Sequence, residues 1–361
     1  MRFPEFTEEW VNVSLKDVAD FQKERISSGL LDESTYISTE NILQNFQGVQ
    51  SAISIPANTN VVAYKKNDIL LSNIRPYLKK VWFSDRIGGC SADVFVLRSK
   101  TCEPEFLYNV IASDKFINYV MSGAKGVKMP RGDKNQMESF SFSIPAVVEQ
   151  RKISRLFQLL DERIVTQNKI IEDLKKLKSA IRKKMFSLLK DEYTESFEIN
   201  QLLDYEQPTA YIVANDEYST DTSLTPVLTA NKGFILGYTD EKFGIYQKGE
   251  CIIFDDFTMD AKYVSFPFKV KSSAIKILTA KPNVNLRFMF EYLSYWELKS
   301  EEHKRHYISE IASLVIELPS KERQSIIASL MTSLNSKLDI EAKTKIRYEE
   351  QKRYLLSQMF I

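Results

Sequence analysis

Cysteine, histidine, glycine and proline are all scarce in this chain of 361 residues. The three cysteines, Cys90, Cys102 and Cys251, are too few and too widely spaced for a disulfide framework or a zinc site, which favours a reducing compartment such as the cytoplasm. Eleven glycines and eleven prolines beside 43% hydrophobic residues exclude a disordered or low-complexity chain. Because no run of eighteen apolar residues occurs and the first residues lack a signal-peptide pattern, we expect neither a membrane protein nor an exported one.

Charge of one sign is not in excess either. The chain has 49 basic and 48 acidic residues, a net charge of +1. It is therefore no general polycation, and any contact with nucleic acid must come from local basic patches. At about 150 residues per domain, the length predicts two globular units with a remainder.

An internal repeat accounts for that remainder. When the sequence is shifted by 174 residues, a stretch of 42 positions matches itself without a gap. The matched pairs are Pro145 with Pro319, Gln150 with Gln324, Ile153 with Ile327, Leu156 with Leu330, Leu160 with Leu334, Lys169 with Lys343, Lys178 with Lys352, Met185 with Met359 and Phe186 with Phe360.

Each copy of the repeat predicts a long helix. Apolar residues recur at spacings of three and four from Ile153 to Met185, interrupted by Gln167, while Glu341 and Thr344 break the pattern of the second copy. We expect helices at 145–190 and 319–361, with Pro145 and Pro319 in their first turns. The helices either pair with each other or lie in separate domain cores, and pairing is favoured by their length without interior Gly or Pro. The expected pairing and partner-docking residues are Leu156, Leu160, Ile164, Leu174, Leu177, Ile181, Leu330, Leu334, Leu338, Tyr348 and Leu355.

The two remaining segments, 1–144 and 191–318, are each the size of a domain. Short apolar runs predict strands at Asp68–Ser72, Val94–Leu97, Cys251–Phe254 and Ile275–Leu278. Amphipathic patterns predict helices at Phe106–Met121 and Leu286–Ser300. The expected fold class is therefore α+β, with two globular domains separated by two long helices.

Chain order also constrains how the helices pair. A helix of about forty residues is roughly 60 Å long, whereas a domain of about 130 residues has a radius of gyration of only about 14 Å. The second domain cannot return the chain along the first helix. We therefore expect an antiparallel coiled coil with pseudo-two-fold symmetry and a domain at each end.

Basic residues cluster within both domains, beside polar and aromatic residues that could contact bases. A run of charge can also be no more than a solvated surface. The candidate DNA-binding residues are Asn73, Arg75, Tyr77, Lys79, Lys80, Lys125, Lys128, Arg131, Lys134, Asn231, Lys232, Tyr238, Lys304, Arg305 and His306.

The order domain, helix, domain, helix resembles the specificity subunit of type I restriction-modification systems. Several segments look like parts of that family's target-recognition domains. They are Asn67–Leu78, Cys90–Asp93, Thr225–Ala230, Leu236–Thr239, Ile253–Thr258 and Arg305–Ser309.

The resemblance implies a non-catalytic, DNA-binding subunit. Each domain would read one half of a bipartite target, which we expect to be asymmetric because the two domains differ in length. The helices would dock two methyltransferase subunits, which are joined by motor-nuclease restriction subunits. S-adenosylmethionine, ATP and Mg²⁺ would belong to these partners, since the sequence has no adenine-methylation motif and no Gly-rich phosphate loop.

Three alternatives remain open at this point. Asp255-Asp256, helped by the acid-x-Lys patterns at Asp240–Lys242 and Asp260–Lys262, could hold a metal in an intrinsic endonuclease, although a turn or cap is more usual after a strand. His303 and His306 could bind a metal, but no cysteine lies near them. The chain could also be an assembly scaffold with no role in DNA binding.

Overall fold

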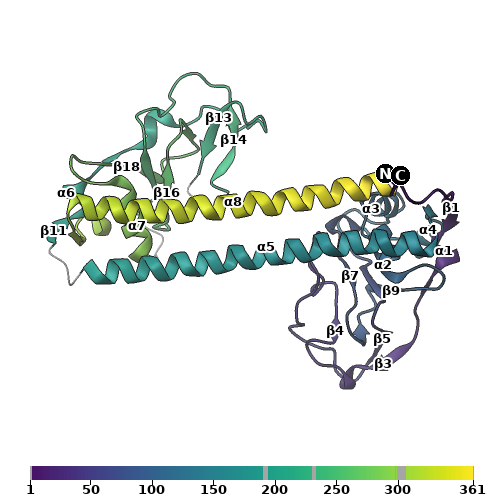
Figure 1. Cartoon of the computed structure of the whole chain (residues 1–361). Coiled ribbons are helices and arrows are strands. Elements are labelled where there is room, and N and C mark those ends of the chain that lie inside the picture. The colour runs from purple at the N-terminus through teal and green to yellow at the C-terminus, as the bar shows by residue number, and fades with distance from the viewer. Residues whose placement is uncertain (1, 190–193, 230–232, 297, 299–305, 361) are drawn as a thin grey trace. The chain divides into compact units, whose positions relative to one another are not determined.

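The computed structural model describes residues 2–189, 194–229, 233–296, 298 and 306–360. The chain divides into two compact units: unit 1 is Met1–Asn168 with Lys343–Ile361, and unit 2 is Lys169–Ala342. The division passes through both long helices, α5 (Val147–Leu188) and α8 (Lys321–Met359), which are the two helices that the repeat predicts (Figure 1). Each unit therefore contains its own segments of α5 and α8.

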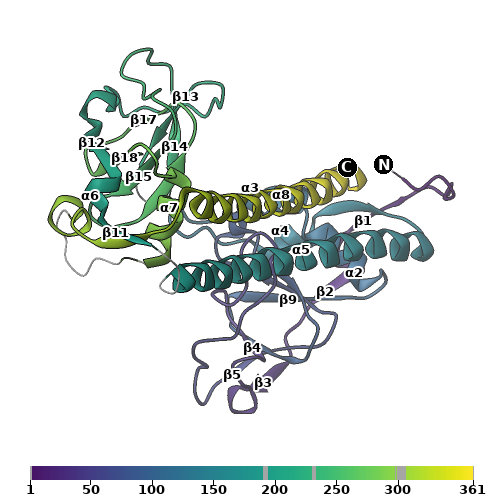
Figure 2. The ribbon, with the colours of Figure 1, turned by 60° about the vertical axis from the view of Figure 1, so that its left-hand side comes forward.

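Unit 1 contains two four-stranded sheets. The helix-side sheet has the order β2-β9-β6-β7, the outer sheet has the order β3-β5-β8-β4, and β1 pairs separately with β10. Figure 2 shows β2 and β9 near α5 and β3, β4 and β5 farther from it. The bounds are β1 (Val11–Ser14), α1 (Leu15–Val18), β2 (Ala19–Phe21), β3 (Arg25–Ser27), η1 (Ser28–Leu30), β4 (Tyr36–Ile37), β5 (Asn60–Tyr64), β6 (Ile69–Ser72), η2 (Pro76–Leu78), β7 (Val81–Phe83), β8 (Gly88–Cys90), β9 (Val94–Ser99), α2 (Pro104–Ile111), α3 (Asp114–Ser122), α4 (Lys134–Glu138) and β10 (Ser141–Ile144).

Unit 2 repeats this plan with a different outer sheet. Its helix-side sheet has the order β12-β18-β15-β16, its outer sheet has the order β14-β13-β17, and β11 pairs separately with β19. The bounds are β11 (Glu195–Glu198), α6 (Ile199–Leu202), β12 (Leu203–Glu206), η4 (Pro208–Tyr211), β13 (Thr225–Leu228), β14 (Ile235–Thr239), β15 (Cys251–Asp255), β16 (Ala261–Val264), β17 (Lys269–Val270), β18 (Ile275–Ala280), α7 (Leu286–Trp296), η5 (Tyr307–Ile311) and β19 (Val315–Leu318).

The central strands are apolar on both faces because each helix-side sheet is covered on both sides. In β6, Ile69 and Leu71 join the core that contains the helix residue Phe157, whereas Leu70 joins a second core with Trp82. In β15, Ile252 and Phe254 likewise join the core with the helices, whereas Cys251 and Ile253 face the outer sheet's core. The four strands predicted from apolar runs are confirmed as β6, β9, β15 and β18.

The predicted helix Phe106–Met121 is wrong in one respect, because the structure has two helices there. α2 ends at Ile111, and Ser113 then caps α3 by accepting a hydrogen bond from the backbone of Phe116 at 3.2 Å. A serine hydroxyl in this position satisfies a backbone donor of the new helix and favours a restart. The helix predicted from Leu286 begins there as α7, and residues 297, 299 and 300 lie outside the described part.

The prediction that Pro145 and Pro319 lie in the first turns of the long helices is wrong, because both prolines precede the helices. α5 begins at Val147 and α8 at Lys321. The carbonyl oxygen of each proline instead accepts a hydrogen bond from the side-chain amide of Gln150 (2.7 Å) or Gln324 (2.9 Å), the matched glutamines of the repeat. α8 runs without a break through Glu341 and Thr344, so these polar residues do not end it.

Within each unit the segments of α5 and α8 run antiparallel, as predicted. In unit 1, Phe157 stacks on Phe360, and Asp161 pairs with Lys352 at 2.6 Å. In unit 2, Lys178 donates to Asn335, and the more C-terminal Phe186 shares a core with the more N-terminal Ile327.

The predicted pairing residues are mostly buried or partly buried, with two exceptions. Leu177 is 49% exposed and Leu330 is 39% exposed, so neither lies on the buried face. Lys178 and Met331 lie on this face instead. Counting in alternating steps of four and three residues from Ile153 and from Ile327 reaches these two positions, each one residue after the predicted leucine. In the described part of the chain, no helix has the length and apolar character needed to cross a membrane.

Candidate nucleic-acid interface

The predicted DNA-binding residues of unit 1 fall on two segments that are tied together by backbone hydrogen bonds. Asn73, directly after β6, accepts a bond from the backbone of Gly132 at 3.1 Å and donates its own N–H to Asp93 at 2.8 Å. The side-chain oxygen of Asn73 is buried and has no hydrogen-bond partner among the described residues. The backbone of Asn73 therefore holds the two segments together, and its side chain is partly buried.

Arg75 and Tyr77 lie on the exposed side of the first segment. Arg75 adopts a left-handed backbone, with φ of 51°, and its N–H donates to the Pro130 carbonyl at 2.8 Å. Such a conformation costs roughly 1–2 kcal/mol for a residue other than glycine, and this hydrogen bond helps to hold it. Tyr77, in η2, is 47% exposed. The Arg75 guanidinium and the Tyr77 ring can thus both reach a ligand in solvent.

The second segment is a hairpin, Lys125–Arg131, which we call the basic hairpin. Lys125 and Arg131 exchange two backbone hydrogen bonds of 2.9 Å each, and Gly126 supplies the positive φ of 100° that the turn requires. Arg131 also bridges to Ile74 in the first segment. The hairpin is therefore fixed at its base against the segment that carries Arg75.

The cations of this surface differ in how they are compensated. Four of them pair with acidic neighbours: Lys79 with Asp114, Lys125 with Asp133 (3.2 Å), Arg131 with Asp93 (3.0 Å) and Lys134 with Glu138 (3.4 Å). Lys80 donates a hydrogen bond to the Thr39 carbonyl at 2.5 Å. Arg75 and Lys128 are exposed and have no ion-pair partner among the described residues. Exposed ion pairs contribute little and exchange readily, so the surface can offer these charges to phosphates.

Unit 2 presents fewer of the predicted residues. Tyr238 lies in β14, partly buried, and exchanges backbone hydrogen bonds with Ser219. Asn231, Lys232, Lys304 and Arg305 lie outside the described residues.

The prediction that His306 contacts DNA is not supported by its position. Its side chain is 3% exposed, and its Nδ1 lies 2.9 Å from a carboxylate oxygen of Glu310. Its backbone N–H donates to the Asp256 carbonyl, which anchors it inside the unit. The metal pair suggested for His303 and His306 includes a residue, His303, that lies outside the described part.

Asp255 and Asp256 are buried and serve the fold, which contradicts the suggested metal pair. Asp255 accepts hydrogen bonds from the backbones of Phe257 (2.9 Å) and Thr258 (3.2 Å), so it caps the turn after β15. Asp256 accepts one from Tyr307 (2.9 Å) and lies 3.4 Å from the buried amine of Lys276. No group of three or more potential metal-binding side chains exists in the described residues.

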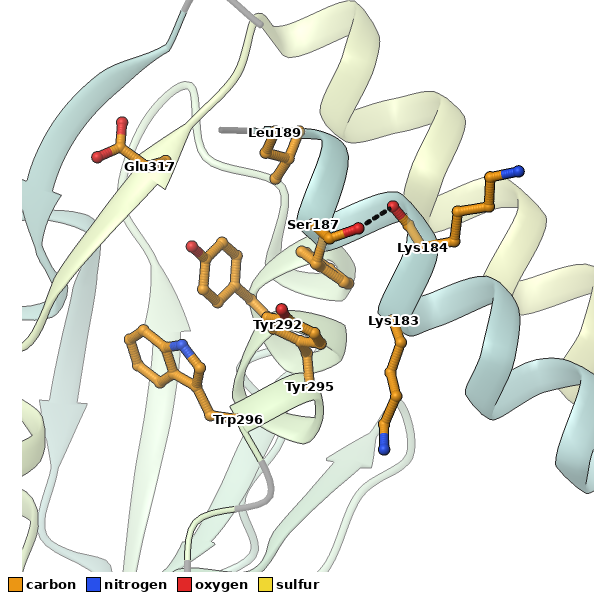
Figure 3. Close-up of a pocket in the computed structure, with 9 residues that line it drawn as sticks. Lys183, Lys184, Ser187, Leu189, Tyr292, Tyr295, Trp296 and Glu317 are labelled. Carbon is orange, nitrogen blue, oxygen red and sulfur yellow. Dashed lines mark hydrogen bonds between the residues drawn. The ribbon is translucent and has the colours of Figure 1, made fainter. Parts of the chain in front are cut away.

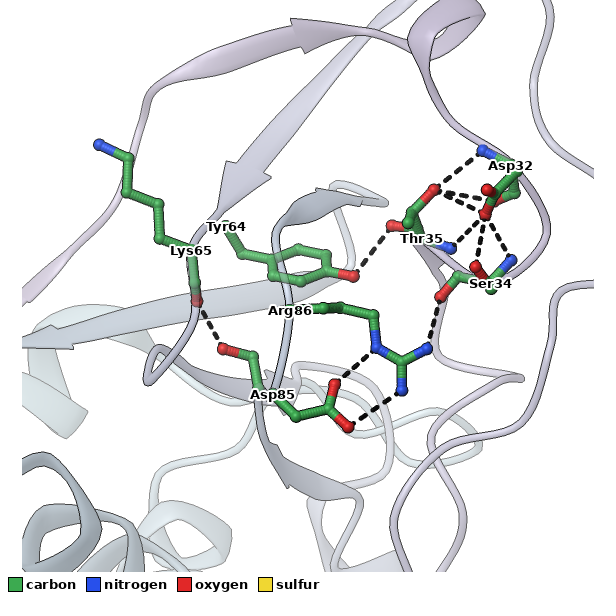
Figure 4. Close-up of polar contacts among 8 residues, drawn as sticks. Asp32, Ser34, Thr35, Tyr64, Lys65, Asp85 and Arg86 are labelled. Carbon is green, nitrogen blue, oxygen red and sulfur yellow. Dashed lines mark hydrogen bonds and ion pairs between the residues drawn. The ribbon is translucent and has the colours of Figure 1, made fainter.

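A polar network that the sequence did not indicate fastens the outer sheet of unit 1 (Figure 4). Asp32 accepts hydrogen bonds from the backbones and hydroxyls of Ser34 and Thr35, which lower the pKa of its carboxyl to about 2. The Tyr64 hydroxyl donates to the Thr35 carbonyl at 2.9 Å, and Arg86 donates to the Ser34 carbonyl at 3.3 Å. The only sequence signal was the common tendency of Asp, Ser and Thr to form such turns.

A pocket of about 750 Å³ in unit 2 was also not predicted. It lies at the end of α5, where Figure 3 shows the rings of Tyr292, Tyr295 and Trp296 from α7 beside the helix. Lys183, Lys184, Ser187 and Glu317 add polar groups to its lining. The spacing of the aromatic residues along α7 was visible in the sequence, but their gathering around the end of α5 depends on tertiary packing.

Comparison with known proteins agrees with this architecture. A specificity subunit of type I restriction enzymes EcoR124I/EcoR124II from Escherichia coli is 39% identical over 178 residues, which is 44% of this chain and 43% of the relative. The MjaVIII specificity subunit from Methanocaldococcus jannaschii is 26% identical over 185 residues, 50% of this chain and 42% of the relative. These alignments therefore span less than half of either relative.

Solved structures show the same fold over nearly the whole chain. The crystal structure of a type I restriction-modification S subunit from M. genitalium matches with a TM-score of 0.65 at 15% identity, covering 98% of this chain and 96% of the other. A chain from a structural study of type I complex assembly matches with a TM-score of 0.60 at 17% identity and covers 97% of each.

The family comparison covers both units. The model of the type I restriction modification DNA specificity domain matches twice, at residues 7–176 and 192–350. The two matches take in most of the chain, including most of α5 and most of α8. This chain belongs to the family of type I restriction modification DNA specificity proteins.

Proposed function

We propose that this chain is the DNA-recognition subunit of a type I restriction-modification complex and acts in the cytoplasm. Each unit reads one half of a bipartite, asymmetric target, and the length of the paired helices sets the spacing between the half-sites. The observation that carries the proposal is the surface of unit 1, where Arg75, Tyr77 and Lys128 are exposed on two segments locked to each other. Cations on such a surface bind phosphates, while polar and aromatic neighbours reach base edges.

The chemistry belongs to partner subunits in this proposal. Two methyltransferase subunits dock on the helices and methylate adenine, and restriction subunits supply the motor and nuclease. S-adenosylmethionine, ATP and Mg²⁺ bind to those partners. Asp255 and Asp256, the strongest candidates for a metal pair in this chain, are engaged by backbone donors and by Lys276, which supports a purely recognising role.

Charge reversal tests the DNA-binding part of the proposal. The double variant Lys128→Glu, Arg131→Glu should lose at least tenfold in affinity for duplex DNA, and the slope of log affinity against log salt should fall by about 2, since two phosphate contacts are removed. Lys23→Glu, an exposed lysine elsewhere in unit 1, is the matched control. Binding would be measured by fluorescence anisotropy over a salt series.

The same variant separates DNA binding from assembly. Co-purification with the methyltransferase subunits should be unchanged, because both substitutions lie outside α5 and α8. If affinity and salt slope stay at the level of the control variant, unit 1 does not bind DNA through this surface. If assembly alone is lost, a scaffold role is favoured over recognition.

A further inference from the structure

The tip of the basic hairpin carries apolar side chains that the fold does not use. Val127 is 100% exposed and Met129 is 48% exposed. Neither residue belongs to any hydrophobic core of unit 1. A single exposed apolar residue is ordinary on a protein surface, but two on one short turn between cations form a distinct feature.

The hairpin that presents this tip is held firmly. Its base is closed by the paired backbone bonds of Lys125 and Arg131, and the Pro130 carbonyl accepts from Arg75 at 2.8 Å. At Gly126 an added Cβ would lie 3.2 Å from the Met129 carbonyl oxygen, so the turn is tight as well as left-handed. An apolar contact made by a rigid tip loses little conformational entropy on binding.

The charges around the tip favour one kind of partner. Lys128 lies between Val127 and Met129, is exposed and has no ion-pair partner among the described residues. Lys125 is 83% exposed at its side chain, with only a single exposed pairing to Asp133. A narrow basic projection with an apolar end matches a groove of duplex DNA, which is lined by phosphates and displays one apolar group, the 5-methyl of thymine.

We propose that Val127 and Met129 are specificity-determining residues that pack against a thymine methyl group in the major groove, while Lys128 contacts the adjacent phosphates. The inference rests on the proposed function, since it assumes that unit 1 reads a half-site. A half-site with an adenine to be methylated contains an A·T pair, so a thymine is present. The tip thereby contributes base discrimination, and the lysines contribute affinity that does not depend on sequence.

Replacing thymine by uracil removes only the methyl group and tests the contact directly. The target is first mapped as the methylated sequence in cells that carry this chain and its partners. The complex of the full chain with its methyltransferase subunits is then titrated with duplexes that carry deoxyuridine at each thymine of both half-sites in turn. One position, in one half-site only, should weaken binding about fourfold, as expected for one buried methyl group.

Variants of the tip connect that loss to the two residues. The double variant Val127→Ser, Met129→Ser should bind the thymine and uracil duplexes equally well, and it should fold normally because both side chains are exposed. Lys128→Gln should weaken all duplexes and lower the salt slope by about 1 while keeping the preference for thymine. Ile53→Ser, which removes an exposed apolar residue from another part of unit 1, should behave as the wild type.

The outcomes distinguish this inference from the proposed function. If no position responds to uracil, or if the serine variant keeps the wild-type preference, the inference is wrong although recognition of the target stands. If the wild-type complex binds its mapped sequence no better than unrelated DNA, the proposed function itself fails.

Discussion

The two units are alike where they meet the long helices and unlike in their outer sheets. Both helix-side sheets have four strands in the same order along the chain, β2-β9-β6-β7 and β12-β18-β15-β16, and every pairing in them is antiparallel. The outer sheets differ in strand number among the described residues, with four in unit 1 and three in unit 2, although each has one parallel pair, β4 with β8 and β13 with β17. The repeated helices thus share a repeated platform, and the outer parts are built independently on it.

The likeness extends to single hydrogen bonds. Gln150 accepts from the backbone of Glu103 at 2.9 Å, and Gln324 accepts from Asn285 at 2.9 Å, just before α2 and α7. After the central strands, the carbonyl of Asn73 accepts from Gly132, and the carbonyl of Asp256 accepts from His306. His306 thus occupies the backbone position of Gly132, although its side chain is buried, unlike the partly exposed Gly132.

Polar residues in the helix seams distinguish the units again. In unit 2, Arg182 pairs with the fully buried Glu291 at 2.6 Å, and Lys178 donates to Asn335. The helix repeat matches Arg182 with Leu356, Lys178 with Lys352 and Asn335 with Asp161. Counting from the glutamine-bonded residues before α2 and α7 matches Glu291 with Asn109. Lys352 there pairs with Asp161. In unit 2 the carboxylate that pairs with a cation of the helix seam is the buried Glu291 of α7. In unit 1 it is Asp161 of α5, which is more exposed.

The largest expected effect comes from removing that buried charge. Glu291→Ala leaves Arg182 without its carboxylate and should destabilise unit 2 by about 3–5 kcal/mol. Asn109→Ala, the matched change in unit 1, removes a hydrogen bond to the Glu105 carbonyl and should cost only about 1 kcal/mol. Amide hydrogen exchange followed by mass spectrometry resolves the units and would measure both.

This contrast fails if the two variants destabilise their units equally. A double variant, Glu291→Leu with Arg182→Leu, serves as the control. It should recover much of the lost stability, because it removes both charges and not one.

Replacing the matched glutamines Gln150 and Gln324 should have an intermediate effect on stability, equal in both units. Gln150→Ala and Gln324→Ala each leave a partly buried backbone donor and a proline carbonyl without partners, which should cost about 1–3 kcal/mol. Exchange should rise first in the opening turns of α2 and α7, where the lost donors lie. Costs that differ by more than about 1 kcal/mol would show that the two junctions are not equivalent.

The sequence predicted those features that depend on periodicity and missed those that depend on tertiary contacts. The repeat predicted both helices, chain order predicted their antiparallel pairing, and apolar runs predicted the central strands. The seam is displaced by one residue at Leu177 and Leu330. At the first position a partly buried lysine, Lys178, replaces an apolar residue, so an apolar pattern misses it; at the second, Leu330 and Met331 are both apolar and the pattern does not separate them. Of the candidate site, Arg75 and Lys128 are exposed and their contact with DNA stays a prediction, while the burial of His306 involves a distant bond to Asp256.

The smallest effect concerns the outer sheets and follows from their different carboxylates. Hydrogen bonds from Ser34 and Thr35 lower the pKa of Asp32 in unit 1 to about 2, and the amine of Lys269 lowers the pKa of Glu241 in unit 2. A carboxyl whose pKa is lower in the folded state stabilises it above its ordinary pKa, and this contribution is lost as pH falls through the folded value. For Asp32 the loss therefore falls between about pH 4 and pH 2.

Local opening at acid pH would test this difference between the outer sheets. Protection of the amides of Ser34 and Thr35, corrected for intrinsic exchange rates, should decrease as pH falls from about 4 to about 2. The side chain of the Asp32→Asn variant cannot titrate, so protection of these two amides should change little over the same pH interval. Amide protection in the outer sheet of unit 2, around Glu241 and the buried Lys269, should depend on pH in the same way in the wild type and in the variant. A wild-type profile that matches Asp32→Asn would mean that the turn is held by its backbone and by Tyr64, and that its carboxylate contributes nothing.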